Sequence, residues 1–269
     1  MSKGLTYTKK SATMKIGDKD VTDSFRETLT SQEDGSTVVT WTCDDLKTAG
    51  VELDSTTKVV VTYKATLNKK AVIGSAGNPN TVNLTYSNNP NEGGEGETGK
   101  TPDDKNIVFT YKTVVNKVDQ QGQSLAGAGF TLQKKVNGAY TDVKSFTAGE
   151  ATKFEFTGLD DGDYKLIEST TPEGYNTITP IEFTISATHD ETADEPTLIS
   201  LSGNATSGVA TFNNDKDAGS LTTNVVNKKG STLPETGGMG TTLLYAVGGV
   251  LVALAAAYII ISKKHEKAE

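Results

Sequence analysis

Residues 109–119 read Phe109-Thr110-Tyr111-Lys112-Thr113-Val114-Val115-Asn116-Lys117-Val118-Asp119, and aromatic and β-branched residues of this kind favour a strand. Successive side chains of a strand point to opposite faces, so Lys117 shares a face with Val115 and Tyr111. Further short strand patterns, separated by turn signals, follow at residues 125–133, 154–156, 164–168, 181–185 and 220–228. This series of short strands predicts a β-sandwich over residues 105–229.

The residues before this unit predict a second β region. Strand patterns occupy residues 37–41, 58–65 and 82–86, and residues 44–47 suggest a helical turn. Residues 90–104 are rich in Gly, Glu and Pro, which predicts a linker or a long exposed loop. We therefore expect an all-β fold of tandem immunoglobulin-like β-sandwiches followed by one C-terminal transmembrane helix, divided into residues 1–89, 90–104, 105–229 and 230–269.

The C-terminal residues have the order of an anchoring signal. The pentapeptide Leu233-Pro234-Glu235-Thr236-Gly237 precedes an uncharged run over residues 241–261, and a basic tail with Lys263, Lys264 and Lys267 follows. About 20 apolar residues can span a bilayer, and the lysines suit its cytoplasmic side. This order resembles the cell-wall sorting signal of Gram-positive surface proteins; the other interpretation is an ordinary membrane anchor after a chance pentapeptide.

The resemblance implies that the chain is a substrate of a sortase. Pro234 holds the peptide extended or kinked, and Gly237 leaves little bulk beside the Thr236–Gly237 bond. In the family, the sortase cysteine attacks the carbonyl carbon of this threonine and forms a thioester. An amine of a peptidoglycan precursor, or a lysine of another pilin subunit, then takes the acyl group. The membrane insertion of residues 241–261 is thus expected to be transient.

Composition excludes several classes of function. The 269 residues carry a formal net charge of −8, which does not suggest a nucleic-acid partner. Cys43 is the only cysteine, so an intramolecular disulfide is impossible. The two histidines, His189 and His265, lie in a polar loop and in the basic tail, which makes a histidine-based active site improbable. We expect no metal site, no cofactor and no enzymatic turnover.

Three motifs in residues 105–229 resemble those of Cna B-type domains. They are Lys117-x-Asp119, Leu125-Ala126-Gly127-Ala128-x-Phe130, and Tyr164-x-Leu166-x-Glu168-x-x-x-Pro172-x-Gly174-Tyr175. The resemblance implies an isopeptide bond between a lysine of the first strand and an asparagine of the last strand, assisted by the glutamate of the third motif. These residues correspond to Lys117, Asn227 and Glu168.

Strand alternation supports this assignment. Asn227 shares a face with Val225 and Leu221, whereas Asn224 falls on the opposite face and is the poorer candidate. Burial disfavours the charged form of an amine and of a carboxylic acid, so a neutral Lys117 could attack the side-chain carbonyl of Asn227. Protonated Glu168 could then shuttle protons while ammonia leaves. The alternative interpretation has no bond: Lys117 would be a solvated lysine, Glu168 a surface glutamate and Asn227 an asparagine in a turn.

The first region resembles the middle domain of Gram-positive backbone pilins. The resemblance lies in residues 61–68, 77–80 and 86–90. It implies that Asn88 or Asn89 is the remnant of a second isopeptide site, although the same residues are also a turn signal. The lysine and helper acid of that family are expected upstream of Met1. No signal-peptide core follows Met1, so we expect an N-terminally truncated chain whose first region lacks its first strands.

These observations give two functional hypotheses. The first is a structural subunit of a Gram-positive pilus, or a pilin-like protein anchored in the cell wall. The alternative is a wall-anchored adhesin or ancillary pilin whose B-type domain is a stalk and whose host ligand the sequence does not name. Polymerising pilins carry a lysine motif of the Tyr-Pro-Lys type, which these 269 residues do not contain. Upstream sequence with that motif would favour the first hypothesis.

Overall fold

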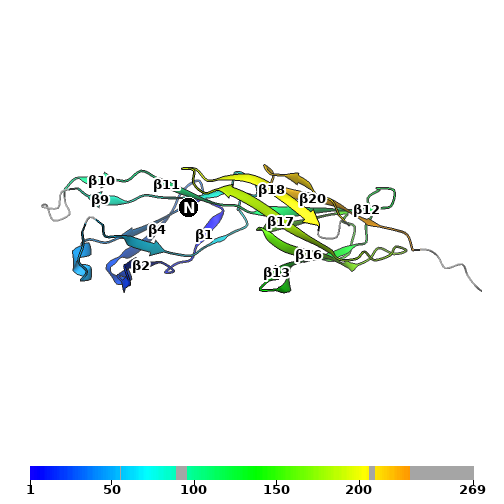
Figure 1. Ribbon diagram of the computed structural model, residues 1–269, viewed down its shortest axis with the longest axis horizontal. Helices are drawn as coiled ribbons and strands as arrows, with labels where there is room; N and C mark the ends of the chain where they lie inside the picture. The colour runs from blue at the N-terminus through cyan, green and yellow to red at the C-terminus, as the bar shows by residue number, and fades with distance from the viewer. Residues whose placement is uncertain (55, 89–95, 206–209, 231–269) are drawn as a thin grey trace, which may run out of the picture. The chain divides into compact units, whose positions relative to one another are not determined.

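The computed structural model describes residues 1–54, 56–88, 96–205 and 210–230, and most of its regular structure is β-strand (Figure 1). This confirms the expected all-β class. The predicted helical turn is a 3-10 turn, η2 (Leu46–Ala49), and the side chain of Asp45 caps it by accepting from the backbone N–H of Lys47. Within the described residues no helix has the length and hydrophobicity to traverse a bilayer. The expected span, residues 241–261, lies outside them.

Residues 111–227 form the sandwich that the strand patterns predict. In the described part of the chain, one sheet has the order β15-β12-β20-β19 and the other the order β14-β13-β16-β17-β18. The strands of the first sheet are β12 (Tyr111–Asp119), β15 (Lys153–Leu159), β19 (Asn213–Asp215) and β20 (Ser220–Asn227). Those of the second are β13 (Gly129–Val136), β14 (Ala139–Phe146), β16 (Gly162–Thr170), β17 (Ile181–Asp190) and β18 (Thr197–Ala205).

Alternation along the strands builds the core of this sandwich. Strand β16 buries Tyr164, Leu166 and Glu168 and turns the intervening side chains outward. Strand β20 buries every second residue from Leu221 to Asn227 in the same way. The core is otherwise apolar, with aromatic side chains such as Phe130, Phe154, Phe156 and Phe183. Polar side chains on these inward positions therefore lie where water is excluded.

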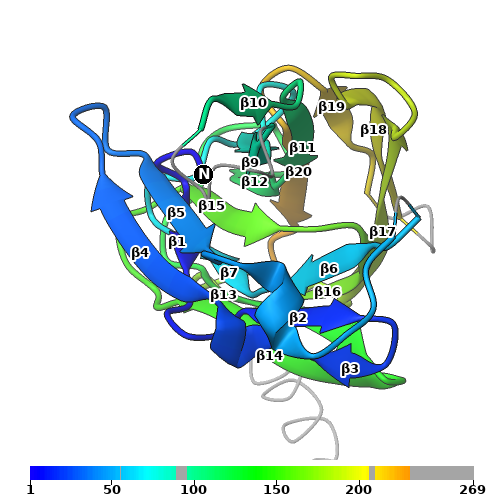
Figure 2. The ribbon, with the colours of Figure 1, turned by 90° about the vertical axis from the view of Figure 1, so that its left-hand side faces the viewer.

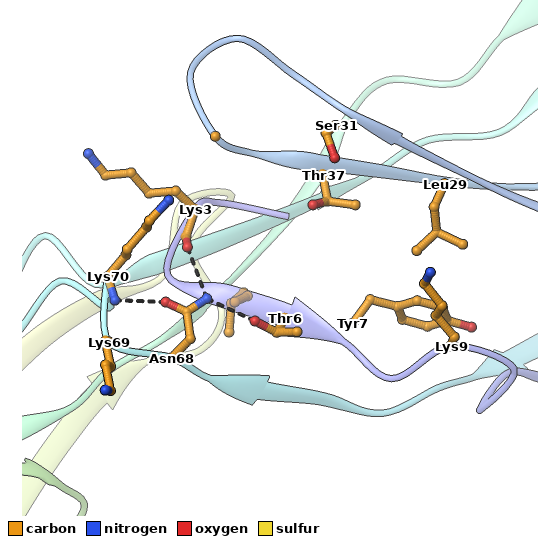
Figure 3. Close-up of a pocket in the computed structure, with 12 residues that line it drawn as sticks. Lys3, Thr6, Tyr7, Lys9, Leu29, Ser31, Thr37, Asn68, Lys69 and Lys70 are labelled. Atoms are coloured by element: carbon orange, nitrogen blue, oxygen red, sulfur yellow. Dashed lines mark hydrogen bonds between the residues drawn. The ribbon is translucent and has the colours of Figure 1, made fainter.

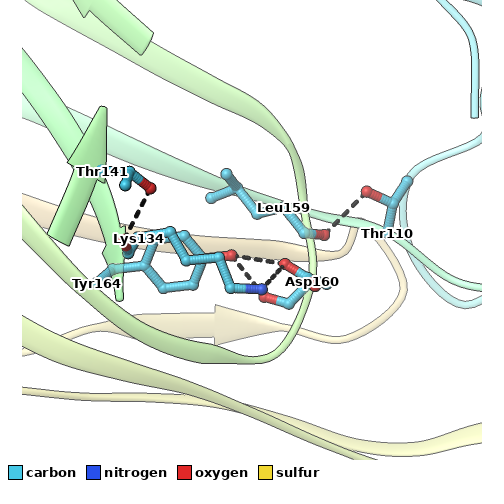
Figure 4. A network of polar contacts seen from close by, with 6 residues as sticks. All are labelled: Thr110, Lys134, Thr141, Leu159, Asp160 and Tyr164. Carbon is cyan, nitrogen blue, oxygen red and sulfur yellow. Dashed lines mark hydrogen bonds and ion pairs between the residues drawn. The ribbon is translucent and has the colours of Figure 1, made fainter. Parts of the chain in front are cut away.

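The turn between β15 and β16 is fixed by polar contacts around Asp160 (Figure 4). The hydroxyl of Tyr164 donates to the carboxylate of Asp160 at 2.9 Å and to its backbone oxygen at 3.0 Å, and Lys134 forms an ion pair with the same carboxylate. Burial works against the charge of Asp160, but these two donors hold the pKa of its carboxyl below the usual value. These contacts tie the turn at residues 160–161 to β13 and β16.

The first region consists of small antiparallel pairs (Figure 2). In the described residues, β1 (Leu5–Tyr7) pairs with β7 (Ala65–Leu67), and β4 (Arg26–Ser31) pairs with β5 (Thr37–Thr42). Strand β2 (Thr13–Ile16) lies between β3 (Lys19–Asp20) and β6 (Val59–Thr62). A small core around Met14 holds them together, with Trp41 and Tyr63 packed against it. The predicted strand over residues 58–65 is therefore split between β6 and β7.

The described end of the stretch expected to be a linker, residues 96–104, contains strand segments that pair with the first region. Strand β10 (Thr98–Lys100) pairs with β9 (Thr85–Ser87), and β11 (Asp104–Val108) pairs with β8 (Asn78–Val82). The expected boundary at residue 104 is therefore wrong, because the pairing of the first region continues to Val108. The polar composition of this stretch suggested a linker, but backbone pairing can hold exposed polar segments as strands without large apolar side chains.

Backbone and side-chain contacts join the first region to the sandwich. The N–H of Gly74 donates to the backbone oxygen of Thr110 at 3.0 Å, and the hydroxyl of Ser75 donates to the carboxylate of Asp217 at 3.1 Å. Gly74 has φ of +96°, and a Cβ atom there would lie 2.2 Å from the backbone oxygen of Asp217. Gly74 thus permits a close approach that no other residue type allows.

We expect Gly74→Ala to destabilise the chain more than a matched glycine substitution. Gly122 also has positive φ, at +78°, but nothing lies within 4 Å of its virtual Cβ. Gly122→Ala should lose only about 1–2 kcal/mol from the left-handed backbone. Gly74→Ala should lose roughly a further 1–3 kcal/mol from the clash. Urea unfolding measures both, and equal losses would show that the Gly74 contact does not hold in solution.

Candidate isopeptide site

The first and last strands of the sandwich are neighbours, and this brings the predicted residues together. Strand β12 pairs with β20 in parallel, with Lys117 opposite Val225 and Asp119 opposite Asn227. Lys117 and Asn227 both point inward, and each is 0 % exposed. Glu168 enters the same space from β16 on the facing sheet and is 6 % exposed. A lysine, a carboxyl group and an asparagine thus share one buried site.

The amine of Lys117 is held by backbone carbonyls. Its Nζ donates to the oxygen of Val118 at 2.9 Å and to that of Val225 at 3.2 Å. Burial lowers the pKa of Lys117, and the negative charges of Glu168 and Asp119 only partly oppose this. Two acceptors match the two N–H groups of a neutral amine, which leaves its lone pair available.

The carboxyl group of Glu168 is oriented by three donors. Its Oε2 accepts from Nδ2 of Asn227 at 2.9 Å, from the N–H of Ile178 at 3.1 Å and from the hydroxyl of Thr171 at 3.2 Å. Its Oε1 is buried and has no hydrogen-bond partner among the described residues. Because Oε2 is fully used as an acceptor, Oε1 is the atom at which a proton would reside in the acid form.

The carboxamide of Asn227 is held by its nitrogen. Nδ2 donates both to Glu168 and to the backbone oxygen of Asn176, the latter at 2.8 Å. Both partners are acceptors, which fixes the nitrogen and oxygen positions of the amide. Its Oδ1 is buried and has no partner among the described residues. Buried polar atoms without partners are rare, and a catalytic role is one of the explanations for them.

The other predicted site residues lie elsewhere. Asn224 is exposed on the outer face of β20, where its Oδ1 accepts from Asn116 at 3.1 Å. Asn88 is exposed after β9, and its N–H donates to the oxygen of Glu97 at 3.1 Å. Asn89 and the pentapeptide Leu233-Pro234-Glu235-Thr236-Gly237 lie outside the described residues. Cys43 is a free, partly exposed thiol.

Sequence reasoning missed the loop that supports Glu168. Thr171, Asn176 and Ile178 hold the carboxyl group and the carboxamide, two of them through backbone atoms. Backbone atoms leave no residue-type signal, so only the adjacent turn at Pro172 and Gly174 pointed to this segment. The described residues contain no group of His, Cys, Asp and Glu arranged to hold a metal ion.

Residues 111–227 thus form a β-sandwich that buries Lys117, Glu168 and Asn227 together. Comparison with family models gives three matches. Residues 112–196 match a prealbumin-like fold domain, residues 1–90 match the Cna-B-like domain of Gram-positive pilin backbone subunit 2, and residues 225–268 match the LPXTG cell wall anchor motif.

Known proteins agree with these matches. The chain is 32% identical over 170 residues to the trypsin-resistant surface T6 protein of Streptococcus pyogenes serotype M6, covering 58% of this chain and 29% of that relative. The structure of the T6 backbone pilin has a TM-score of 0.53 at 22% identity, over 86% of this chain and 60% of that one. The pilus 2b backbone protein of group B streptococcus has a TM-score of 0.52 at 20% identity, over 87% and 83%. The two structures show the fold.

Taken together, the matches place a pilin-backbone Cna-B-like domain in residues 1–90, a prealbumin-like fold domain in residues 112–196 and an LPXTG cell wall anchor motif in residues 225–268. They agree with the resemblance to wall-anchored backbone pilins that the sequence indicated. The anchor motif and the pilin domains indicate a protein of the Gram-positive cell surface. The chain spans 29% of the length of the T6 relative, so it corresponds to part of that protein.

Proposed function

We propose that this chain is a structural subunit of a Gram-positive pilus, joined by a sortase at Thr236 and stabilised by an isopeptide bond between Lys117 and Asn227. The observation that carries the proposal is the burial of Lys117 and Asn227 on the adjacent strands β12 and β20, with Glu168 reaching the same site from β16 of the facing sheet. The role is mechanical, and the chemistry of the site occurs once, without turnover. The sortase acts on the chain as on a substrate, and the receiving amine belongs to the wall or to another subunit.

The geometry supports a specific order of steps. The lone pair of Nζ of Lys117 attacks Cγ of Asn227, while the carbonyls of Val118 and Val225 hold the amine. One proton passes from Nζ to Nδ2 by way of Glu168, whose Oε2 already contacts Nδ2. The Cγ–Nδ2 bond breaks, ammonia leaves, and an Nζ–Cγ amide remains. Glu168 returns to its starting protonation state, so atoms and charges balance.

Intact mass tests the proposal. The purified chain should weigh less than its sequence mass by one ammonia, and trypsin should give a branched peptide that joins Lys117 to Asn227. Asn227→Ala should restore the full mass. Asn224→Ala removes an asparagine on the outer face of the same strand and should leave the loss unchanged. A folded wild-type chain with the full sequence mass would refute the bond, and a loss abolished only by Asn224→Ala would refute the strand register.

A further inference from the structure

The side-chain amide of Asn227 is bonded through its nitrogen alone. In Asn68, by comparison, Nδ2 donates to two oxygens at 2.9 and 3.0 Å and Oδ1 accepts from the N–H of Lys70 at 2.7 Å (Figure 3). Asn78, which is 0 % exposed like Asn227, is likewise bonded at both ends, since its Oδ1 accepts from Val72 and its Nδ2 donates twice. Asn227 uses both hydrogens of Nδ2, whereas its Oδ1 has no partner among the described residues. The site therefore recognises the nitrogen of this side chain and not its acyl oxygen.

Two acceptors face this nitrogen, and both need a hydrogen from it. Oε2 of Glu168 lies 2.9 Å from Nδ2 of Asn227, and the backbone oxygen of Asn176 lies 2.8 Å from it. A backbone oxygen cannot donate, and Oε2 already accepts from the N–H of Ile178 at 3.1 Å. The atom of residue 227 at this position must therefore carry two hydrogens. A carboxamide nitrogen carries two, whereas a carboxyl oxygen carries one in its acid form and none when ionised.

The acceptor of Asn176 is held in place from the last strand. The N–H of Asn176 donates to the backbone oxygen of Lys228 at 2.9 Å, so residue 176 contacts both the residue after β20 and the side chain of Asn227. The loop before it is closed by the N–H of Tyr175, which donates to the oxygen of Pro172 at 3.2 Å. Pro172 is buried, which ties this loop to the sandwich. Because of these contacts, we expect the oxygen of Asn176 to stay in place when the side chain at position 227 is changed.

We infer that the backbone oxygen of Asn176 makes the site specific for asparagine, and against aspartate, as the partner of Lys117. The inference rests on the proposed isopeptide function. With asparagine, the Nζ–Cγ bond forms, the Cγ–Nδ2 bond breaks, one proton passes from Nζ to Nδ2, and ammonia leaves beside two acceptors for its hydrogens. With neutral aspartic acid at position 227, the same exchange would release water. Its single O–H can satisfy only one of the two acceptors, and the other would be left buried without a donor, which is costly.

Asn227→Asp keeps the size of the side chain and removes both N–H donors. We expect the folded variant to keep its full mass, or to lose one water roughly tenfold or more slowly than the wild-type chain loses ammonia, as for a buried acceptor without a donor. Intact mass, measured at intervals after a short pulse of cell-free synthesis, gives both rates. Asn224→Asp makes the same change on the outer face of β20 and should lose ammonia at the wild-type rate. Loss of water from Asn227→Asp at the wild-type rate would overturn the specificity and leave the bond standing, whereas a wild-type chain of full mass would refute the bond itself.

Exchange of the side-chain amide hydrogens tests the contact without the chemistry of aspartate, and it serves equally if Asn227→Asp does not fold. Lys117→Met removes the nucleophile and leaves the carboxamide of Asn227 unreacted, so that NMR can observe it. Both hydrogens of Nδ2 should exchange with solvent roughly a hundredfold more slowly than those of the exposed Asn224, because each is bonded within the sandwich. Rapid exchange of either hydrogen, in a chain that still melts cooperatively, would show that two acceptors do not hold this nitrogen and would overturn the inference.

Discussion

Glu168→Ala should keep the fold of the sandwich, restore the full sequence mass and lower the melting temperature by roughly 15–20 °C. The carboxyl group contacts Asn227 directly and is the only acid among the three residues, so its loss removes the proton relay. Without the bond, the unfolded chain regains the freedom of a loop of about 110 residues, which by analogy with a disulfide is worth about 4–5 kcal/mol. Each kcal/mol corresponds to about 3–5 °C for a domain of this size.

Matched variants separate the crosslink from the loss of a buried group. Glu168→Gln retains the shape of the side chain but cannot relay a proton, so it should also leave the full mass. Lys117→Met removes the nucleophile, fills similar space and should melt close to Glu168→Gln. Glu182→Gln removes an exposed glutamate that pairs with Lys165 on the outer face, and it should change neither mass nor melting temperature appreciably. A cross-linked Glu168→Gln chain would show that the carboxyl group is not the relay.

Thr236→Pro, or deletion of Gly237, should move nearly all of the protein from the wall fraction to the membrane or the medium of a sortase-positive Gram-positive host. The reason is chemical, because the thioester forms at the carbonyl of Thr236 and the bond to Gly237 must break. The mature wild-type protein should end at Thr236 in an amide bond to wall or to another subunit. Fractionation, followed by peptide mapping of the C-terminus, measures both.

Thr232→Ala is the control for this signal, because it lies just outside the pentapeptide and should be anchored normally. Recovery of peptides from residues 241–261 attached to wall-fraction protein would contradict sorting at Thr236. Lys117→Met should still be anchored, since the sandwich and the signal act separately. Loss of anchoring in that variant would instead mean that the isopeptide bond is needed for export or recognition.

The sequence predicted the interior of the sandwich better than its edges. The two-residue period of a strand distinguishes faces directly, and the structure buries Asn227 while it exposes Asn224. Edge strands β14 and β18 were not predicted, because their mixed and largely exposed residues show little alternation. Strands β10 and β11 escaped prediction for a related reason: they are held by pairing with β9 and β8 rather than by apolar side chains.

The supporting parts of the site were beyond sequence reasoning. Lys117, Glu168 and Asn227 stand in recognisable motifs and on predictable faces. The N–H of Ile178 and the oxygen of Asn176 contribute through the backbone of a loop, whose path depends on tertiary packing rather than on residue type.

The parallel pairing of β12 with β20 determines which residues bear force when the two ends of the sandwich are pulled. Tension entering at Tyr111 would run along β12 to Lys117, cross the amide to Asn227 and leave through Lys228. The intervening hundred or so residues, 118–226, lie outside this covalent load path. With the bond in place, their loops can lengthen, shorten or change sequence without weakening the domain in extension, so surface variation and tensile strength become independent properties of the same domain.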